Sequence, residues 1–274
     1  MKMKLLLLHL AVLLFACYNT AVSQSVGIGT PAPAGRLHVV GNTDISQLII
    51  DASNAQTNIN PLIRLRSIAG SDLLWIHSDN QYNTFIGLNS GRVNDAVGGA
   101  VANTFIGSSA GYSNTTGHSN TSLGYGAIYA NNTGFENTAI GRQAFASNTI
   151  GTENTANGFK AGFYNISASR NIAIGNYALY GQAYDPGFVW NSDNVAVGHS
   201  ALYFNQPTST SNGIYNTAIG NFSLYHNNTG YYNTAAGYNA LYNNTTGFKN
   251  TAMGSAALFS NTFGLYNTAT GNYA

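Results

Sequence analysis

The stretch "NTAIGNFSLYHNNTGYYNTAAGYNALYNNTTGFKNTAMG", from Asn216 to Gly254, shows the organisation of most of the chain. The phrase Asn-Thr-Ala-x-Gly occurs in it three times, and each copy begins seventeen positions after the previous one. Related phrases begin at eleven positions, and seven of the ten intervals between them have this same length. These positions are Asn83, Asn103, Asn120, Asn137, Asn154, Asn171, Asn194, Asn216, Asn233, Asn250 and Asn267. A short and regular period of this kind indicates a repeat architecture.

Each repeat has a constant chemical pattern when its first Asn is counted as position one. Position three is usually Ala, position four is usually a larger apolar residue, and position five is Gly in every copy. Position eight is Ala or Ser, and position ten is aromatic in eight of ten copies. Most units end in "NTTG" or a close variant, as at Asn244–Gly247. Asn and Gly tolerate left-handed backbone, so this segment predicts a turn.

The length of the repeat selects the fold class. Seventeen residues are too few for a helical hairpin repeat, which needs about 33 residues. They suit one coil of a β-solenoid, with "NTAIG" as one strand and "xALYx" as a second. We therefore expect an all-β protein, a parallel β-roll or β-solenoid about 50 Å long. Like residues would stack on like, so the Asn at position one would form a ladder of side-chain amides.

The first strand of each coil avoids charge on both of its sides. Successive strand residues point to opposite faces, and positions three and four are both apolar. A strand without a polar face is normally buried on both sides, and a narrow coil covers only one side from within. This argues for a homotrimer or other homo-oligomer. The alternative is a single-chain β-helix wide enough to cover both sides. The candidate interface or core residues are Ile106, Ile140, Ile174, Val197, Ile219 and Met253.

The pattern "NTAIGxxALYxNTTGxx" resembles the head repeats of trimeric autotransporter adhesins, the YadA-like or Hep/Hag type. The segment Ser25–Gly41, "SVGIGTPAPAGRLHVVG", is similar to the opening of exported bacterial fibre proteins that contain such repeats. The resemblance spans Asn83–Ala274 and implies a left-handed parallel β-roll, three chains per head and a role in surface attachment. The sequence shows neither the heptad stalk nor the membrane barrel of those adhesins, and no fibre-end chaperone domain.

Residues 1–23 have the three parts of a secretory signal peptide. Lys2 and Lys4 precede an apolar run, and small residues follow at Ala21 and Ser23. The run is shorter than the roughly 20 residues that a membrane-spanning helix needs, so we expect no transmembrane span. Cleavage after Ser23 would give a secreted or cell-surface protein. A lipoprotein attached at Cys17 is the alternative, although Phe15 fits that motif poorly. Residues 24–82 form short β-branched runs and are expected to be a β-rich cap for the repeats of residues 83–274.

Composition and motifs give no sign of catalysis. Charged residues make up 7% of the chain and the formal net charge is +1, so nucleic acid is an unexpected partner. The segment Gly107–Gly111 matches the G-x-S-x-G pattern of a nucleophile elbow, but it falls inside an ordinary repeat without a following helix. The histidines do not pair at metal-ligand spacing. We therefore expect a protein that is not an enzyme, with no cofactor and no metal.

Two features could bind a ligand. The first is the aromatic column at position ten, including Tyr180, Tyr203 and Tyr225, which would either stack as struts or offer a surface to a glycan or an extended polypeptide. The second is a pair of insertions in the neighbouring units at Asn171 and Asn194. Insertions in repeat proteins map to one face, often the binding face. The candidate ligand-binding residues there are Tyr184, Asp185, Phe188, Trp190 and Gln206.

These observations predict a non-catalytic extracellular structural protein or adhesin, a rigid head or spacer that binds itself and a glycan or matrix protein. Two alternatives stay open. One is a monomeric β-solenoid that binds glycan, or binds ice through a row of Thr that includes Thr217, Thr234 and Thr251. The other is a polysaccharide-active β-helix, which the lack of clustered acid and base residues disfavours.

Overall fold

A computed structural model describes residues 26–28, 37–39, 50, 58 and 60–274. The chain divides into two compact units, Met1–Asp51 and Ala52–Ala274. In the first unit, β1 (Val26–Ile28) and β2 (Leu37–Val39) pair in parallel, with Val26 opposite Leu37. The predicted signal peptide of residues 1–23 and the alternative lipid site at Cys17 lie outside the described residues.

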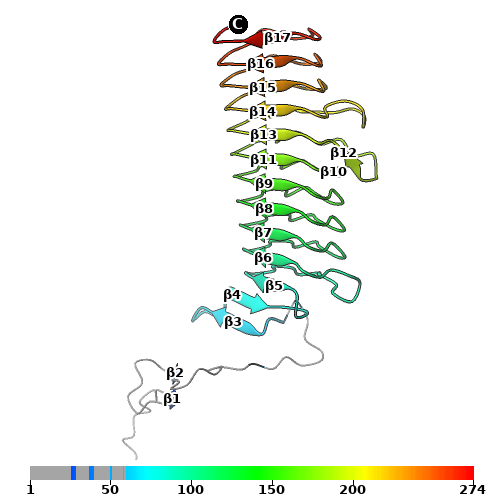
Figure 1. Cartoon of the computed structure of the whole chain (residues 1–274). Helices are drawn as coiled ribbons and strands as arrows, with labels where there is room; N and C mark the ends of the chain where they lie inside the picture. The colour runs from blue at the N-terminus through cyan, green and yellow to red at the C-terminus, as the bar shows by residue number, and fades with distance from the viewer. Residues whose placement is uncertain (1–25, 29–36, 40–49, 51–57, 59) are drawn as a thin grey trace, which may run out of the picture. The chain divides into compact units, whose positions relative to one another are not determined.

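The second unit is a parallel β-solenoid with coils of about 17 residues, which confirms the predicted fold class (Figure 1). Each repeat places its Thr-Ala-Ile triplet, or a variant of it, on a three-residue strand that pairs in register with the strands of the coils before and after. The stacked strands are β5 (Thr84–Ile86), β6 (Thr104–Ile106), β7 (Thr121–Leu123), β8 (Thr138–Ile140), β9 (Thr155–Asn157), β11 (Ile172–Ile174), β13 (Val195–Val197), β14 (Thr217–Ile219), β15 (Thr234–Ala236), β16 (Thr251–Met253) and β17 (Thr268–Thr270).

An antiparallel hairpin covers the first coil. The hairpin consists of β3 (Ile63–Arg66) and β4 (Asp72–His77), and β4 pairs antiparallel with β5. Because the hairpin extends the same sheet, the edge of β5 is hydrogen-bonded and is not open to other chains. Part of the predicted cap region therefore continues the solenoid sheet directly. A further short parallel pair, β10 (Ala168–Ser169) and β12 (Trp190–Asn191), lies where the first insertion leaves the stack.

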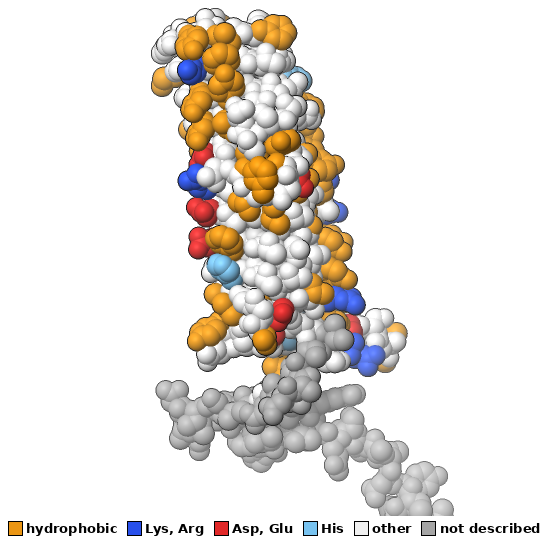
Figure 2. All heavy atoms as spheres, turned by 90° about the vertical axis from the view of Figure 1, so that its right-hand side faces the viewer, with side chains coloured by type: hydrophobic (Ala, Val, Ile, Leu, Met, Phe, Trp, Pro, Cys, Tyr) orange, Lys and Arg blue, Asp and Glu red, His pale blue; other side chains and the backbone are white. Residues whose placement is uncertain are grey.

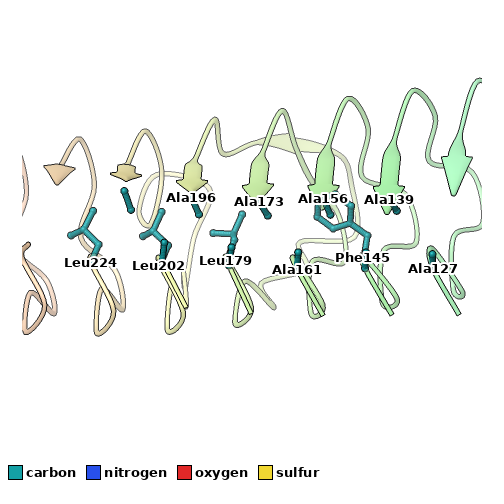
Figure 3. Close-up of a cluster of buried hydrophobic side chains, with 14 of the residues drawn as sticks. Ala127, Ala139, Phe145, Ala156, Ala161, Ala173, Leu179, Ala196, Leu202 and Leu224 are labelled. Carbon is teal, nitrogen blue, oxygen red and sulfur yellow. The ribbon is translucent and has the colours of Figure 1, made fainter. Parts of the chain in front are cut away.

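The strands have one buried and one outward side within the chain. The central residue of the triplet, such as Ala139, Ala156 or Ala173, points inward and is fully buried (Figure 3). The residues on either side, at positions two and four, point outward and are at least partly exposed. The single chain is therefore not a β-helix wide enough to cover both sides of this strand.

The opposite wall of the core is a turn, so the expected second strand is absent from the coils that the structure describes. In the coil that starts at Asn137, Gln143 and Phe145 have φ values of 59° and 47°, and the same left-handed conformation recurs in the other coils. Such residues cannot form an extended strand. The turn still stacks, because the Ile128 amide donates to the Ala144 carbonyl at 2.9 Å. It buries positions eight and nine against the strand Ala, as with Ala161, Leu179 and Leu202 in Figure 3.

Core volume is balanced between positions three and nine. Where position three is the large Phe105, position nine is Gly111, and where position three is Ala139, position nine is Phe145. A Cβ added to Gly111 would lie 2.4 Å from the Phe105 ring. The core is thus only two side chains thick, and in these coils a large residue at one of the two positions faces a small residue at the other.

Two ladders of buried asparagine run along the stack, and the one at position twelve is interrupted between Asn165 and Gln182. At position one, the Asn120 amide donates to Oδ1 of Asn103 at 2.9 Å, and its Nδ2 donates to the Gly134 carbonyl at 2.9 Å. At position twelve, Nδ2 of Asn131 donates to Oδ1 of Asn114 at 2.7 Å and to the same Gly134 carbonyl at 2.9 Å. The position-one ladder confirms the prediction, whereas the position-twelve ladder was expected only as a turn. Both ladders satisfy backbone groups that would otherwise be buried without partners.

The invariant Gly at position five has a steric cause. Gly124 has a φ of 137°, and a Cβ there would approach the Gly141 carbonyl oxygen of the next coil to 2.6 Å. Both the backbone conformation and the close approach of successive coils therefore require glycine. Within the described ranges, no helix is both long enough and apolar enough to cross a membrane.

We predict that Gly111→Ala destabilises the solenoid by about 1–3 kcal/mol, because the added methyl group must displace the Phe105 ring. The matched control is Gly126→Ala. Gly126 has a similar left-handed φ of 60°, but the nearest atom to its added Cβ is 3.7 Å away. Denaturant unfolding would measure both variants. Equal stabilities for the two variants would contradict the account of core packing.

Candidate functional site

The outward side of the strands carries the residues predicted at the interface. Ile140, Ile174, Ile219 and Met253 are 36%, 39%, 48% and 50% exposed. Ile106 and Val197 occupy the same row and are partly exposed. None of these side chains belongs to the core of the single chain. Positions two and four share this side, and neither is charged in any of the eleven coils. The result is a narrow, uncharged strand face along the rod.

The structure separates the residues predicted in the insertion loops. Trp190 is only 5% exposed and packs with Ala168 and Ile214 in a small cluster beside the main core. Tyr184 lies edge-on to Trp190, with ring centroids 5.8 Å apart. Trp190 therefore stabilises the first insertion and does not contribute an exposed binding surface. The sequence alone does not show that Trp190 is buried, because an aromatic residue in a loop can either pack against the protein or bind a ligand.

The other predicted loop residues are accessible. Asp185 accepts a hydrogen bond at 2.9 Å from the Gly187 amide and thereby shapes the loop. Phe188 is 58% exposed. Gln206 lines a small hollow of ≈ 260 Å³ together with Tyr180 and Tyr203. Viewed from the insertion side, the rod is mostly uncharged, with a hydrophobic patch near mid-height (Figure 2). The five predicted residues do not converge on one cavity.

The aromatic residues at position ten form a continuous stack over six coils. Successive ring centroids lie 4.9–5.6 Å apart, and successive ring planes differ by at most 19°. The members are Phe163, Tyr180, Tyr203, Tyr225, Tyr242 and Phe259. This confirms the predicted alignment of the column. Contacts between the rings stabilise the stack beyond the area that they bury.

The column is interrupted once between its first two rings and the stack of six. Tyr112 and Tyr129 stack at 5.0 Å, and Arg92 extends this pair, with its guanidinium carbon 5.5 Å from the Tyr112 ring. Position ten of the next coil is Ala146, and the column resumes at Phe163. A hollow of ≈ 580 Å³ opens at this place, lined by Tyr129, Ala146 and Phe163 among other residues. The sequence shows that Ala146 replaces an aromatic residue at position ten, but only the stacked structure shows that a hollow results.

The column also changes the acidity of its phenols. Burial, followed by the hydrogen bond and charge of Tyr164, raises the pKa of Tyr180 to about 12. Burial is also the main cause that raises the pKa of Tyr203 and of Tyr225. At the cap, burial lowers the pKa of His77, whose ring lies 5.2 Å from that of Phe85. Each shift follows from loss of solvent around the charged form.

Within the described residues, no three His, Cys, Asp or Glu side chains lie close enough together to hold a metal ion. Ser109, the central residue of the elbow-like match, lies in the left-handed turn at position seven with a φ of 58°. That position carries Gln143 and Lys160 in later coils, so the turn is a property of the repeat.

No family model matches the chain, and neither a curated protein nor a solved structure gives a significant match to it. The fold shown by the structure is therefore the firmest basis for a functional proposal.

We predict that the solenoid loses stability between about pH 10 and pH 12. The pKa of Tyr180 is near 10 when the chain is unfolded and about 12 when it is folded, so the folded state binds more protons in this window. The contribution of Tyr180 is complete below pH 10 and is lost as the pH rises through 12. Tyr180→Phe retains the stacked ring and removes the ionisable group. Melting temperatures at pH 8 to 12 should therefore fall less steeply for Tyr180→Phe. Parallel curves for the two proteins would contradict the assignment.

Proposed function

We propose that this chain is a non-catalytic, exported structural protein, a rigid spacer or head that assembles into a homotrimer and mediates attachment to a surface. The observation that carries the proposal is the uncharged outward face of the strands. It repeats along eleven coils, and its position four, which is apolar in nine of them, is left partly exposed by the single chain.

Exposed apolar rows of this length usually mark an interaction surface. A second copy is the simplest occupant, because its strand face has the same length, the same period and the same chemistry. Eleven coils at about 4.8 Å give a face about 50 Å long. A closed ring of three such faces would bury the row from every chain. The signal-peptide pattern of residues 1–23 supports export, and the resemblance to adhesin head repeats supports attachment.

Ice binding is less well supported by the arrangement. A flat ice-binding face needs aligned, uniform side chains. Here the outward Thr row at position two lies beside position four, which varies among residues as different as Asn157, Ala236 and Met253. A polysaccharide-active enzyme would need a pair of carboxyl groups with distinct environments, whereas Glu136 and Glu153 occupy the same exposed position of successive coils.

The proposal predicts a trimer at micromolar concentrations for residues 24–274 in sedimentation equilibrium. Ile219→Lys should give a folded monomer, because Ile219 is 48% exposed in the single chain. A lysine at this position would be buried, and therefore costly, only in the assembly. Asn228→Lys is the matched control, since Asn228 is exposed in a turn away from the strand face.

A well-folded monomer of the unmodified protein would contradict the proposal. So would a trimer that Ile219→Lys leaves intact. Circular dichroism of both variants would show that a change in mass does not come from unfolding.

A further inference from the structure

The interruption of the aromatic column at Ala146 creates a slot for one ring. Adjacent coils are about 4.8 Å apart, so the rings of Tyr129 and Phe163, two coils apart, flank a space of about 10 Å. Inside the stack an aromatic ring occupies the middle of such a space, as Tyr203 and Tyr225 do at 4.9–5.2 Å from each neighbour. Ala146 has only a methyl group there, and a hollow of ≈ 580 Å³ takes the place of the ring.

The slot leaves Tyr129 more exposed than the tyrosines inside the stack, whereas Phe163, on its other side, is half-buried like them. Tyr129 is 42% exposed, whereas Tyr203 and Tyr225, with rings on both sides, are half-buried. Ala130 and Ile166 also line the hollow and add apolar surface to it. A flat guest with two apolar faces would therefore regain the contacts that the missing ring makes in other coils.

The rim of the slot is polar and its hydrogen-bonding capacity is unused. Ser109, Gln143 and Ser147 line the hollow, and their side chains form no hydrogen bond within the described chain. The amide of Gln143 offers two donors and an acceptor, and each hydroxyl offers both. No acidic residue lines the hollow, and Lys160 places its Nζ 5.0 Å from the Phe163 ring.

A pyranose ring matches both features of this site. Its two faces carry C–H groups that pack on aromatic rings, while its hydroxyl groups radiate from the edge of the ring towards polar partners. An aromatic side chain would fill the space but leave the polar rim unsatisfied. Binding sites that join an apolar surface to a few convergent polar groups are the usual form for small ligands.

We propose that the hollow at Ala146 binds one pyranose residue of a glycan, held between Tyr129 and Phe163 and hydrogen-bonded by Gln143. The inference names a ligand class for the attachment role proposed above and rests on that role. Its test reads this hollow alone, so its failure would leave the test of self-association unaffected.

The experiment uses the full chain and two probes, a neutral β-1,4-linked glucose hexamer and a hexamer of uronic acid residues. Saturation-transfer NMR would detect contact with ring C–H protons, and calorimetry would measure affinity. We expect at least one hexamer to bind with a Kd of about 1 mM or tighter. The neutral and acidic probes show whether Lys160 selects a carboxylate.

Ala146→Phe is the decisive variant. It restores the ring that most other coils carry, so the protein should fold with at least its original stability while affinity falls about tenfold or more, a loss of about 1.4 kcal/mol. Gln143→Ala should also weaken binding. Tyr215→Ala is the control, since Tyr215 is 42% exposed and stacks in a different column, on Tyr232. It should leave affinity unchanged.

Three results would overturn the proposal. The first is no binding of either hexamer at concentrations well above about 1 mM. The second is binding that Ala146→Phe leaves intact. The third is an equal loss of affinity with Tyr215→Ala, which would show that any exposed tyrosine accounts for the signal.

Discussion

The structure depends on buried asparagine amides that join each coil to the next. An Asn side chain has a carbonyl oxygen that accepts hydrogen bonds and an NH2 group that donates two. It can therefore bond to a neighbouring coil and to a turn of its own coil at the same time. At Gly134 the two ladders meet, because one carbonyl accepts from both Asn120 and Asn131. Each coil is thus closed by a crosslink through its interior. Only 7% of the residues are charged, and the core is two side chains thick. The hydrogen-bonded networks therefore replace the ion pairs and large apolar cores of other proteins.

The ladders also explain where insertions are tolerated. In the coil that starts at Asn171, position twelve is Gln182, and the inserted residues follow it. Gln182 donates to Oγ of Ser192 at 2.7 Å, and Ser192 donates to Oδ1 of Asn171 at 2.6 Å. The longer side chain and a serine from the end of the insertion therefore connect this coil to the position-one ladder, but Oδ1 of Asn165, in the coil before, is left buried without a hydrogen-bond partner. The loop can grow outside the stack because the position-one ladder stays hydrogen-bonded there, through Ser192 to Asn171 and from the Asn194 backbone amide to Asn171.

Much of this fold could be predicted from the sequence, because a constant repeat length places each residue of one coil above the equivalent residue of the previous coil. The strand at Thr-Ala-Ile, the amide ladder at position one and the aromatic column all follow from it. The prediction of a second strand was wrong, because residues such as Gln143 and Phe145 adopt a left-handed backbone conformation. Their residue types do not indicate this conformation, which is uncommon for residues other than Gly, Asn and Asp. Burial of Trp190 depends on contacts with Ala168 and Ile214, which no local pattern reveals.

The candidate sites were also predictable from the sequence only in part. The uncharged strand face was predictable from alternation, but only the structure shows that position four lies outside the core and that position nine fills it. The slot at Ala146 is a departure from the repeat, and departures carry more functional information here than the consensus does. A coil has few inward positions and all are needed for packing, so any binding role falls to outward columns, to insertions and to gaps in the columns.

The central claim is that the interior amide ladders, rather than the thin apolar core alone, hold successive coils together. Asn148→Ala removes the partner of Oδ1 of Asn131 and of Nδ2 of Asn165 while leaving the backbone turn intact. Asn228→Ala removes an exposed Asn that neighbours the same ladder. Denaturant unfolding should show a loss of about 3 kcal/mol for Asn148→Ala. It should show little change for Asn228→Ala. Stabilities for the two variants that agree within about 0.5 kcal/mol would contradict the claim.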